Sequence, residues 1–223
     1  MNNLTDFIKK ILLAFEQSRT TIKYDDVYKY EDGPNDIKQI TLSFGITEYG
    51  NLKNFIKEYC LKNGRYSKDF NSYIPLIGTK SLAQDTSFIN LLKESASDPV
   101  MQQCQEQAFD SMYITPALAW CSKNNLILPL SQAVIADSFL QSGSILSSIQ
   151  NTFSAKLPVN GGDEKDWITS YCNARKNWLT NHSRKILHNT VYRMDFFLSI
   201  IKNNDWNLEQ KKYIANDVKI VAN

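Results

Sequence analysis

The sequence has few of the residues that build metal centres and disulfide frameworks. Its 223 residues include four cysteines and two histidines. The cysteines stand at wide spacings without a CxxC pair, and they form no zinc-binding pattern with His182 and His188. We therefore expect buried thiols, and we expect neither a metal ion nor another cofactor. The same scarcity argues against a metalloenzyme and against a Cys–His hydrolase.

Long apolar runs are also missing. The chain begins with an amphipathic segment that carries Lys9-Lys10 in its middle. A signal peptide needs an uninterrupted apolar stretch behind a basic start, and a membrane-spanning helix needs about 20 apolar residues. We therefore expect no signal peptide in this chain and no membrane insertion. If the protein acts on a cell wall, we expect it to reach the periplasm or the outside by a route other than Sec.

No charge of one sign dominates. Lys and Arg number 25 against 23 Asp and Glu, which leaves a formal net charge of +2. No predicted helix or strand collects a dense basic stripe, so nucleic acid is not an expected partner. The composition, 43% hydrophobic and 22% charged, is ordinary for a globular protein with a sizeable core.

The hydrophobic periodicity predicts a mostly helical chain with one small sheet. Apolar residues at spacings of three and four predict a helix over 4–16, with Glu16 at its C-terminal end. Two β-prone segments within 27–45 flank a turn rich in Asp, Gly, Pro and Asn, which predicts a β-hairpin. Further helices are expected near 51–62, 84–95, 98–112, 116–123, 129–141, 164–178 and 184–203.

This order of elements favours an α+β fold that is predominantly helical. We expect a single domain over 1–223 with two lobes. The smaller lobe, around 17–55, carries the sheet. The larger lobe comprises 56–223 together with the first helix, and a cleft lies between the two lobes.

The N-terminal quarter contains acidic residues suited to cutting a glycosidic bond. That reaction needs one carboxylic acid to protonate the leaving oxygen and one carboxylate on the other side of the bond. Apolar neighbours around the end of a buried helix would favour the protonated form of Glu16. Thr41 and Ser43 alternate on the returning strand, so both hydroxyls are expected on one side, where they could position a water or the substrate. Taken alone, this pattern is weak.

Four stretches of the sequence strengthen the case for glycosidic-bond cleavage. They are AFEQS at 14–18, YKYED at 28–32 followed by Asp36 and Thr41, DPVMQQCQ at 98–105 with MYITPA at 112–117, and GGDE at 161–164 with Ala174-Arg175 downstream. In this order they resemble the glycoside hydrolase family 46 chitosanases, relatives of the phage-type lysozymes, from about Ile8 to Leu208. The resemblance implies a lysozyme-like fold and an inverting acid/base mechanism, with the two carboxyl groups roughly 6.5–9.5 Å apart.

The resemblance also implies roles for the acidic residues. Glu16 would be the general acid and Thr41 would position the water. Asp36 keeps the family's distance of five residues to Thr41, whereas Asp32 lies 16 residues after Glu16, which is closer to the family's other spacing. We favour Asp36 as the base over Asp32, with Glu31 third.

A supporting charge network is implied behind the acid. Asp163 and Arg175, joined by Arg193, would form buried ion pairs that position Glu16, and Asp137 would be a further buried polar anchor. The alternative is an ion pair with a purely structural role. In either case, removing one partner would leave a buried charge uncompensated.

Two features bear on the substrate. Gly50-Asn51 stands where the family has a Gly-Asp pair, so a carboxylate that could bind a cationic sugar is missing, although Asn51 and Ser43 are still expected to contact substrate. The sequence pI of about 8.2 suits an anionic wall polymer. We therefore favour peptidoglycan, cleaved by a muramidase, over chitosan, cleaved by a chitosanase.

The resemblance extends to phage lysins and to antibacterial effectors of type VI secretion, which implies an immunity protein or a secretion-spike protein as a partner. A second class of function remains open, namely an inactive carbohydrate-binding or interaction protein that keeps the fold. Retention of Glu16, an acidic turn and Thr41 argues against it.

Overall fold

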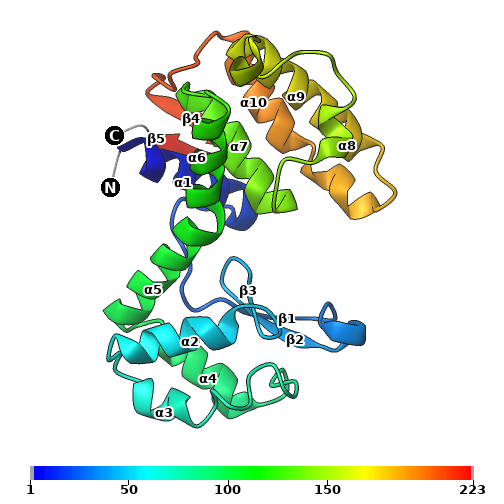
Figure 1. Cartoon of the computed structure of the whole chain (residues 1–223). Helices are drawn as coiled ribbons and strands as arrows, with labels where there is room; N and C mark the ends of the chain where they lie inside the picture. Colours follow the sequence, from blue (N-terminus) through cyan, green and yellow to red (C-terminus); the bar gives the residue numbers. More distant parts are fainter. Residues whose placement is uncertain (1–2, 222–223) are drawn as a thin grey trace. The chain divides into compact units, whose positions relative to one another are not determined.

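The computed structural model describes residues 3–221 and divides into two compact units (Figure 1). Unit 1 takes in the chain up to Thr21 and again from Ser111 onward, and unit 2 runs from Ile22 to Asp110. Within residues 3–221, every helix falls short of the length and apolar character needed to cross a membrane.

Unit 2 contains the predicted hairpin, extended by a third strand. Strands β1 (Val27–Tyr30), β2 (Gln39–Leu42) and β3 (Ile46–Thr47) form an antiparallel sheet in that order. The turn between β1 and β2 includes a short 3₁₀ helix, Pro34–Asp36. Gly33 N donates to Ile37 O at 3.0 Å, and a Cβ at Gly33 would lie 2.6 Å from that oxygen, so only glycine fits this close approach.

The rest of unit 2 is helical. Its helices are α2 (Leu52–Leu61), α3 (Ser67–Asn71), α4 (Thr86–Ser95) and α5 (Pro99–Phe109). Helix α2 packs on β3 and α5, and α4 packs on β1. Asp98 caps the N-terminus of α5 by accepting from Val100 N at 3.0 Å, and it also accepts from the Tyr59 hydroxyl at 2.6 Å. The start of α5 is thereby joined to α2.

Unit 1 is built around α7 (Pro129–Ser142), which packs against three other helices of the unit and is buried along most of its length. Its other elements are α1 (Asn3–Gln17), α6 (Thr115–Lys123), α8 (Ser147–Gln150), α9 (Glu164–Thr180), α10 (Tyr192–Lys202), β4 (Lys212–Ala215), β5 (Val218–Val221) and the 3₁₀ helices Pro158–Asn160 and Lys185–Thr190. A π-helical turn, Asp110–Ile114, precedes α6 and spans the boundary between the units.

The predominantly helical α+β class and the β-hairpin are confirmed. The segment predicted as one helix over 184–203 is instead a 3₁₀ helix followed by α10. The C-terminal hairpin β4–β5 was not predicted. Its strand β4 alternates exposed and buried residues, and its turn, Asn216-Asp217, has φ of +49° and +63°, which is typical of a tight hairpin turn.

The units divide the chain at places different from the predicted lobes. The sheet was assigned to a small lobe ending near residue 55, but α2, α3, α4 and α5 join the sheet in unit 2. The physical reason is that the sheet buries its apolar residues, such as Ile40, Leu42 and Ile46, and needs helices of its own to cover them.

The Tyr59–Asp98 contact yields a first prediction. Tyr59→Phe removes a donor from a buried carboxylate and is expected to lower the free energy of unfolding by about 1.5–3 kcal/mol. Tyr30→Phe is the matched control, because Tyr30 is 49% exposed and its change should stay within about 0.5 kcal/mol. Urea unfolding of both variants measures the difference, and equal effects would contradict the contact's importance.

Candidate active site

Glu16 lies at the C-terminal end of α1, one position after the last residue of the helix's buried face. Ile8, Ile11, Leu12 and Phe15 hold that face in the core of unit 1, and Phe15 packs edge-on against Phe196 and Phe197. The next position therefore leaves the core, and the Glu16 side chain is 35% exposed. Helix packing thus fixes the backbone of Glu16 while leaving its carboxylate accessible.

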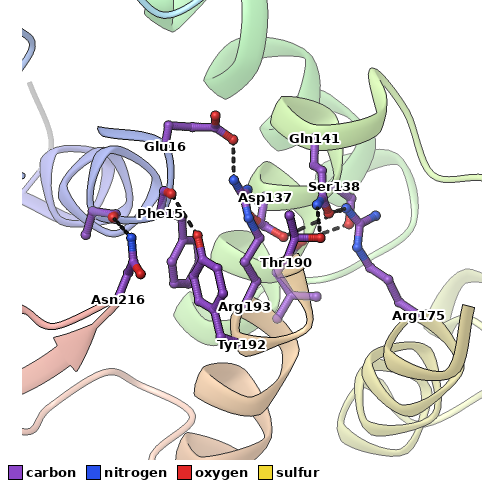
Figure 2. A network of polar contacts seen from close by, with 12 residues as sticks. Phe15, Glu16, Asp137, Ser138, Gln141, Arg175, Thr190, Tyr192, Arg193 and Asn216 are labelled. Carbon is purple, nitrogen blue, oxygen red and sulfur yellow. Dashed lines mark hydrogen bonds and ion pairs between the residues drawn. The ribbon is translucent and has the colours of Figure 1, made fainter. Parts of the chain in front are cut away.

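The carboxylate of Glu16 is bound by Arg193 of α10 (Figure 2). The helix pattern alone predicted apolar neighbours for this carboxylate, whereas the family resemblance predicted Arg193 in a supporting charge network, and the structure places the Arg193 guanidinium there. The difference has a simple cause. Arg193 is itself almost fully buried, 4% exposed at its side chain, and its charge needs carboxylates close by.

Arg193 belongs to a row of alternating charges. Its Nη1 donates to Asp137 Oδ1 of α7 at 2.8 Å, and Asp137 Oδ2 lies 3.9 Å from Nη2 of Arg175 in α9. The side chains of Asp137 and Arg175 are fully buried. Two guanidinium groups and two carboxylates alternate, so each buried charge has an opposite neighbour.

The carboxylates of Asp137 and Glu16 change the pKa of the arginine between them. Burial by itself lowers the pKa of the Arg193 guanidinium, but the negative charges of Asp137 and Glu16 outweigh burial and raise it. Arg193 therefore remains a cation, and the positive charge beside Glu16 is permanent.

The far end of the row is held by neutral groups. Arg175 donates to Gln141 Oε1 at 2.6 Å and to the Tyr171 hydroxyl at 3.2 Å. Gln141 in turn donates to Thr190 Oγ1 at 2.7 Å, and the Tyr171 hydroxyl donates to Ser138 at 2.9 Å. These bonds join α7, α9 and the segment before α10.

Asp163 does not belong to this network, contrary to the prediction. It is exposed and caps the N-terminus of α9, where its Oδ1 accepts from Asp166 N at 2.9 Å. An Asp directly before a helix has this use whatever lies in the core. The central anion is Asp137, which we had predicted only as a separate buried anchor. The predicted burial of Arg175 and Arg193 is confirmed.

Unit 2 carries the candidate bases in the turn after β1. Asp32 Oδ1 accepts from the Gln39 side-chain amide at 2.9 Å, and Gln39 Oε1 accepts from Tyr49 N at 3.1 Å. Both ends of the buried Gln39 amide are therefore used, and Asp32 is held by a fixed donor. Glu31 is exposed and lies 3.6 Å from Lys38.

Asp36 differs from Asp32 in its surroundings. Both residues are exposed, but Asp36 has a left-handed backbone at φ +59°. Among residues 3–221, no hydrogen bond or ion pair holds its carboxylate. Its side chain is thus free to change rotamer, whereas that of Asp32 is anchored.

The predicted substrate contacts are placed as follows. Thr41 lies in β2 opposite Tyr28, but the strand ends at Leu42, and Ser43 has φ +53°, so the two hydroxyls do not alternate on one strand as predicted. Both hydroxyl oxygens are buried without a hydrogen-bond partner among residues 3–221. Asn51 Oδ1 accepts from Thr47 N at 2.9 Å, so the side chain helps to shape the loop before α2.

One aromatic residue near the acid had no predicted role. Burial first, and then the negative charge of Glu16, raise the pKa of Tyr113 to about 12. Tyr113 therefore keeps its hydroxyl proton at neutral pH and is close enough to Glu16 to feel its charge. Its position in the MYITPA stretch was the only sequence signal.

Within residues 3–221, no group of three or more His, Cys, Asp and Glu side chains could hold a metal ion.

Comparisons with known proteins cover most of the chain. The model of Glycosyl hydrolase family 46 matches residues 10–211. A chitosanase of Bacillus subtilis (strain 168) is 26% identical over 231 residues, which cover 94% of this chain and 80% of that protein.

Solved structures are similar in fold. The native chitosanase of Bacillus subtilis MY002 has a TM-score of 0.79 at 23% identity, covering 100% of this chain and 99% of that one. The GH46 chitosanase of Gynuella sunshinyii in complex with chitotetraose has a TM-score of 0.81 at 16% identity, covering 100% and 98%. The predicted lysozyme-like, mostly helical fold is confirmed by these likenesses.

The charge network yields a second prediction. Asp137→Asn leaves two buried guanidinium groups with less negative charge and is expected to lower the free energy of unfolding by about 3–5 kcal/mol. Asp163→Asn is the control, because asparagine caps helices as well as aspartate does and the change should stay within about 0.5 kcal/mol. Guanidinium chloride unfolding compares them. A mild effect of Asp137→Asn would mean that the network does not support unit 1.

Proposed function

The chain belongs to glycosyl hydrolase family 46, and we propose that it is a chitosanase that hydrolyses the β-1,4 bonds between glucosamine units of chitosan. It is a glycoside hydrolase. The observation that carries the proposal is the family match from residue 10 to 211, which begins just before a glutamate held by a buried arginine. The 26% identical relative is a chitosanase, and a structure of similar fold, with a TM-score of 0.80, is a chitosanase variant complexed with 6 GlcN.

Peptidoglycan, the substrate that we favoured from the sequence alone, is not supported by these comparisons. That preference was based on Asn51 and on the net charge, and neither identifies the sugar that binds. Asn51 uses its amide oxygen to hold Thr47 N, so its side chain has a structural use that is independent of any substrate. The net charge of +2 describes the whole surface rather than the groups that meet a substrate. An immunity or secretion partner is accordingly no part of the proposal.

In the proposed mechanism, Glu16 protonates the glycosidic oxygen as the sugar leaves. Arg193 orients the carboxyl group, and Asp137 orients Arg193, so that the acid keeps one geometry. A carboxylate of the hairpin turn activates the water that attacks the anomeric carbon from the other side, which inverts the configuration there.

We propose Asp32 rather than Asp36 as that base. One contact supports this change from the base that the sequence favoured. Asp32 is anchored by Gln39 at 2.9 Å, while Asp36 has no such contact among the described residues. A base that must hold a water in line benefits from a fixed carboxylate.

The substrate is tested by incubating the protein with chitosan oligomers and, separately, with purified peptidoglycan sacculi, and by measuring new reducing ends. We expect hydrolysis of chitosan and intact sacculi. Glu16→Gln is the control for contaminating activity and is expected to lower kcat about 10²- to 10⁴-fold, the range usual for loss of a general acid. Release of sugars from sacculi without chitosan hydrolysis would overturn the proposal.

The choice of base is tested by a matched pair of isosteric variants. Asp32→Asn is expected to lower kcat on chitosan oligomers by about 10²-fold or more, because an amide cannot take the proton of the attacking water. Asp36→Asn, four residues away in the same turn, should retain kcat within about threefold. Circular dichroism checks that both variants fold. The reverse order of activities would identify Asp36 as the base.

A further inference from the structure

Helix α1 ends one residue after Glu16, without the glycine that commonly stops a helix. Its last residue is Gln17, and the next, Ser18, has a left-handed backbone with φ +51°. A residue with a Cβ is strained in this conformation. The last four carbonyl groups of any helix also lack partners inside the helix. The end of α1 therefore depends on contacts from elsewhere in unit 1.

Three of these four carbonyls accept from side chains. Tyr192, which opens α10, donates its hydroxyl to Phe15 O at 2.8 Å. Arg19 donates from Nε to Gln17 O at 3.2 Å. The third donor comes from the C-terminal hairpin, where the side-chain amide of Asn216 donates to Ala14 O at 3.2 Å. Figure 2 shows Asn216 and Tyr192 meeting the end of α1 while Arg193 meets the Glu16 carboxylate.

Asn216 makes a second contact that distinguishes it from the other donors. Its Nδ2 lies 3.1 Å from Ser18 Oγ, so one amide group joins the last turn of α1 to the strained residue that ends the helix. Glu16 lies between these two points in the chain. The amide therefore limits how far the backbone of Glu16 can unwind or shift.

The hairpin that carries Asn216 is itself fixed to unit 1. Tyr213 of β4 is 4% exposed, and its ring lies 5.4 Å from that of Phe7 in α1 and 6.4 Å from that of Phe196 in α10. The Tyr213 hydroxyl donates to Asp205 at 2.5 Å. Asn216 thus reaches α1 from a rigid support.

We propose that Asn216 is a positioning residue for the general acid, holding the C-terminal end of α1 so that Glu16 keeps the geometry needed for proton transfer. The inference rests on the proposed function, in which Glu16 is the acid. It gives the C-terminal hairpin a part in catalysis, although no residue of the hairpin is proposed to touch the substrate.

Asn216→Gly is the variant that isolates this role. Glycine adopts the left-handed backbone at φ +49° without strain, so the turn is kept and only the amide is lost. Asp217→Gly is the matched control, because Asp217 lies in the same turn at φ +63° and makes no hydrogen bond to α1 among the described residues. Tyr192 is a less clean target, since the positive charge of Arg193 also acts on its hydroxyl.

The kinetic readout uses two substrates. One is a chitosan oligomer, whose leaving sugar must be protonated. The other is a 2,4-dinitrophenyl β-glycoside of a glucosamine oligomer, whose phenolate leaves without a proton. On the first substrate Asn216→Gly should lower kcat about tenfold, with KM within about twofold, as expected for a slightly misplaced acid. On the second, its kcat should lie within about twofold of the unmodified protein, and Asp217→Gly should resemble the unmodified protein on both.

The outcomes are distinguishable when Glu16→Gln is measured in parallel. Suppose that Glu16→Gln loses activity on the chitosan oligomer but not on the dinitrophenyl glycoside, and that Asn216→Gly has the same kcat values as Asp217→Gly. The positioning role is then refuted and the proposed function stands. Equal losses for Asn216→Gly on both substrates would likewise refute it, because general damage to the fold would produce them. If Glu16→Gln is unimpaired on the oligomer, the acid assignment fails and the inference with it. Asn216→Asp, which keeps the size but lacks the donor, serves in the same assay if the glycine variant does not fold.

Discussion

The ion pair between Arg193 and Asp137 is the interaction on which the candidate active site depends. Asp137 is fully buried, and its charge is balanced by Arg193 at 2.8 Å and by Arg175 at 3.9 Å. The other terminal nitrogen of Arg193, Nη2, binds Glu16. The charge of Arg193 is permanent because both acids raise the pKa of its guanidinium against the effect of burial. The row forms only when α1, α7, α9 and α10 are all in place, so the orientation of the acid is a property of the whole unit.

The two proposed catalytic carboxylates are held in the same way in their separate units. Each accepts from one donor, and each donor is fixed by a further contact. Arg193 is fixed by Asp137, and Gln39 is fixed because its oxygen accepts from Tyr49 N. A carboxylate held by a fixed donor loses few rotamers when substrate binds, and it therefore needs little reorganisation in the transition state.

The sequence was sufficient for what local periodicity controls. The spacing of apolar residues predicted α1 and placed Glu16 at its end, and the Asp-Gly-Pro-Asn turn predicted the β-hairpin. Pairings between distant segments could not be read in this way. Asp163 matched a motif but caps a helix, whereas Asp137, 56 residues from Arg193, is the anion that pairs with it. The role of Gln39 was missed because a glutamine at a strand start carries no signal, and Asn216 was missed because the short C-terminal strands were not recognised.

The sequence alone gives little information on substrate preference, because one asparagine and a small net charge do not describe the groups that bind a sugar. The central claim is that Glu16 and a carboxylate of the hairpin turn act on opposite faces of one glycosidic bond. Proton NMR of a glucosamine hexamer during the first minutes of digestion tests this directly, before the products mutarotate. The account predicts that the α-anomer of the new reducing ends appears first. Initial formation of the β-anomer would contradict it.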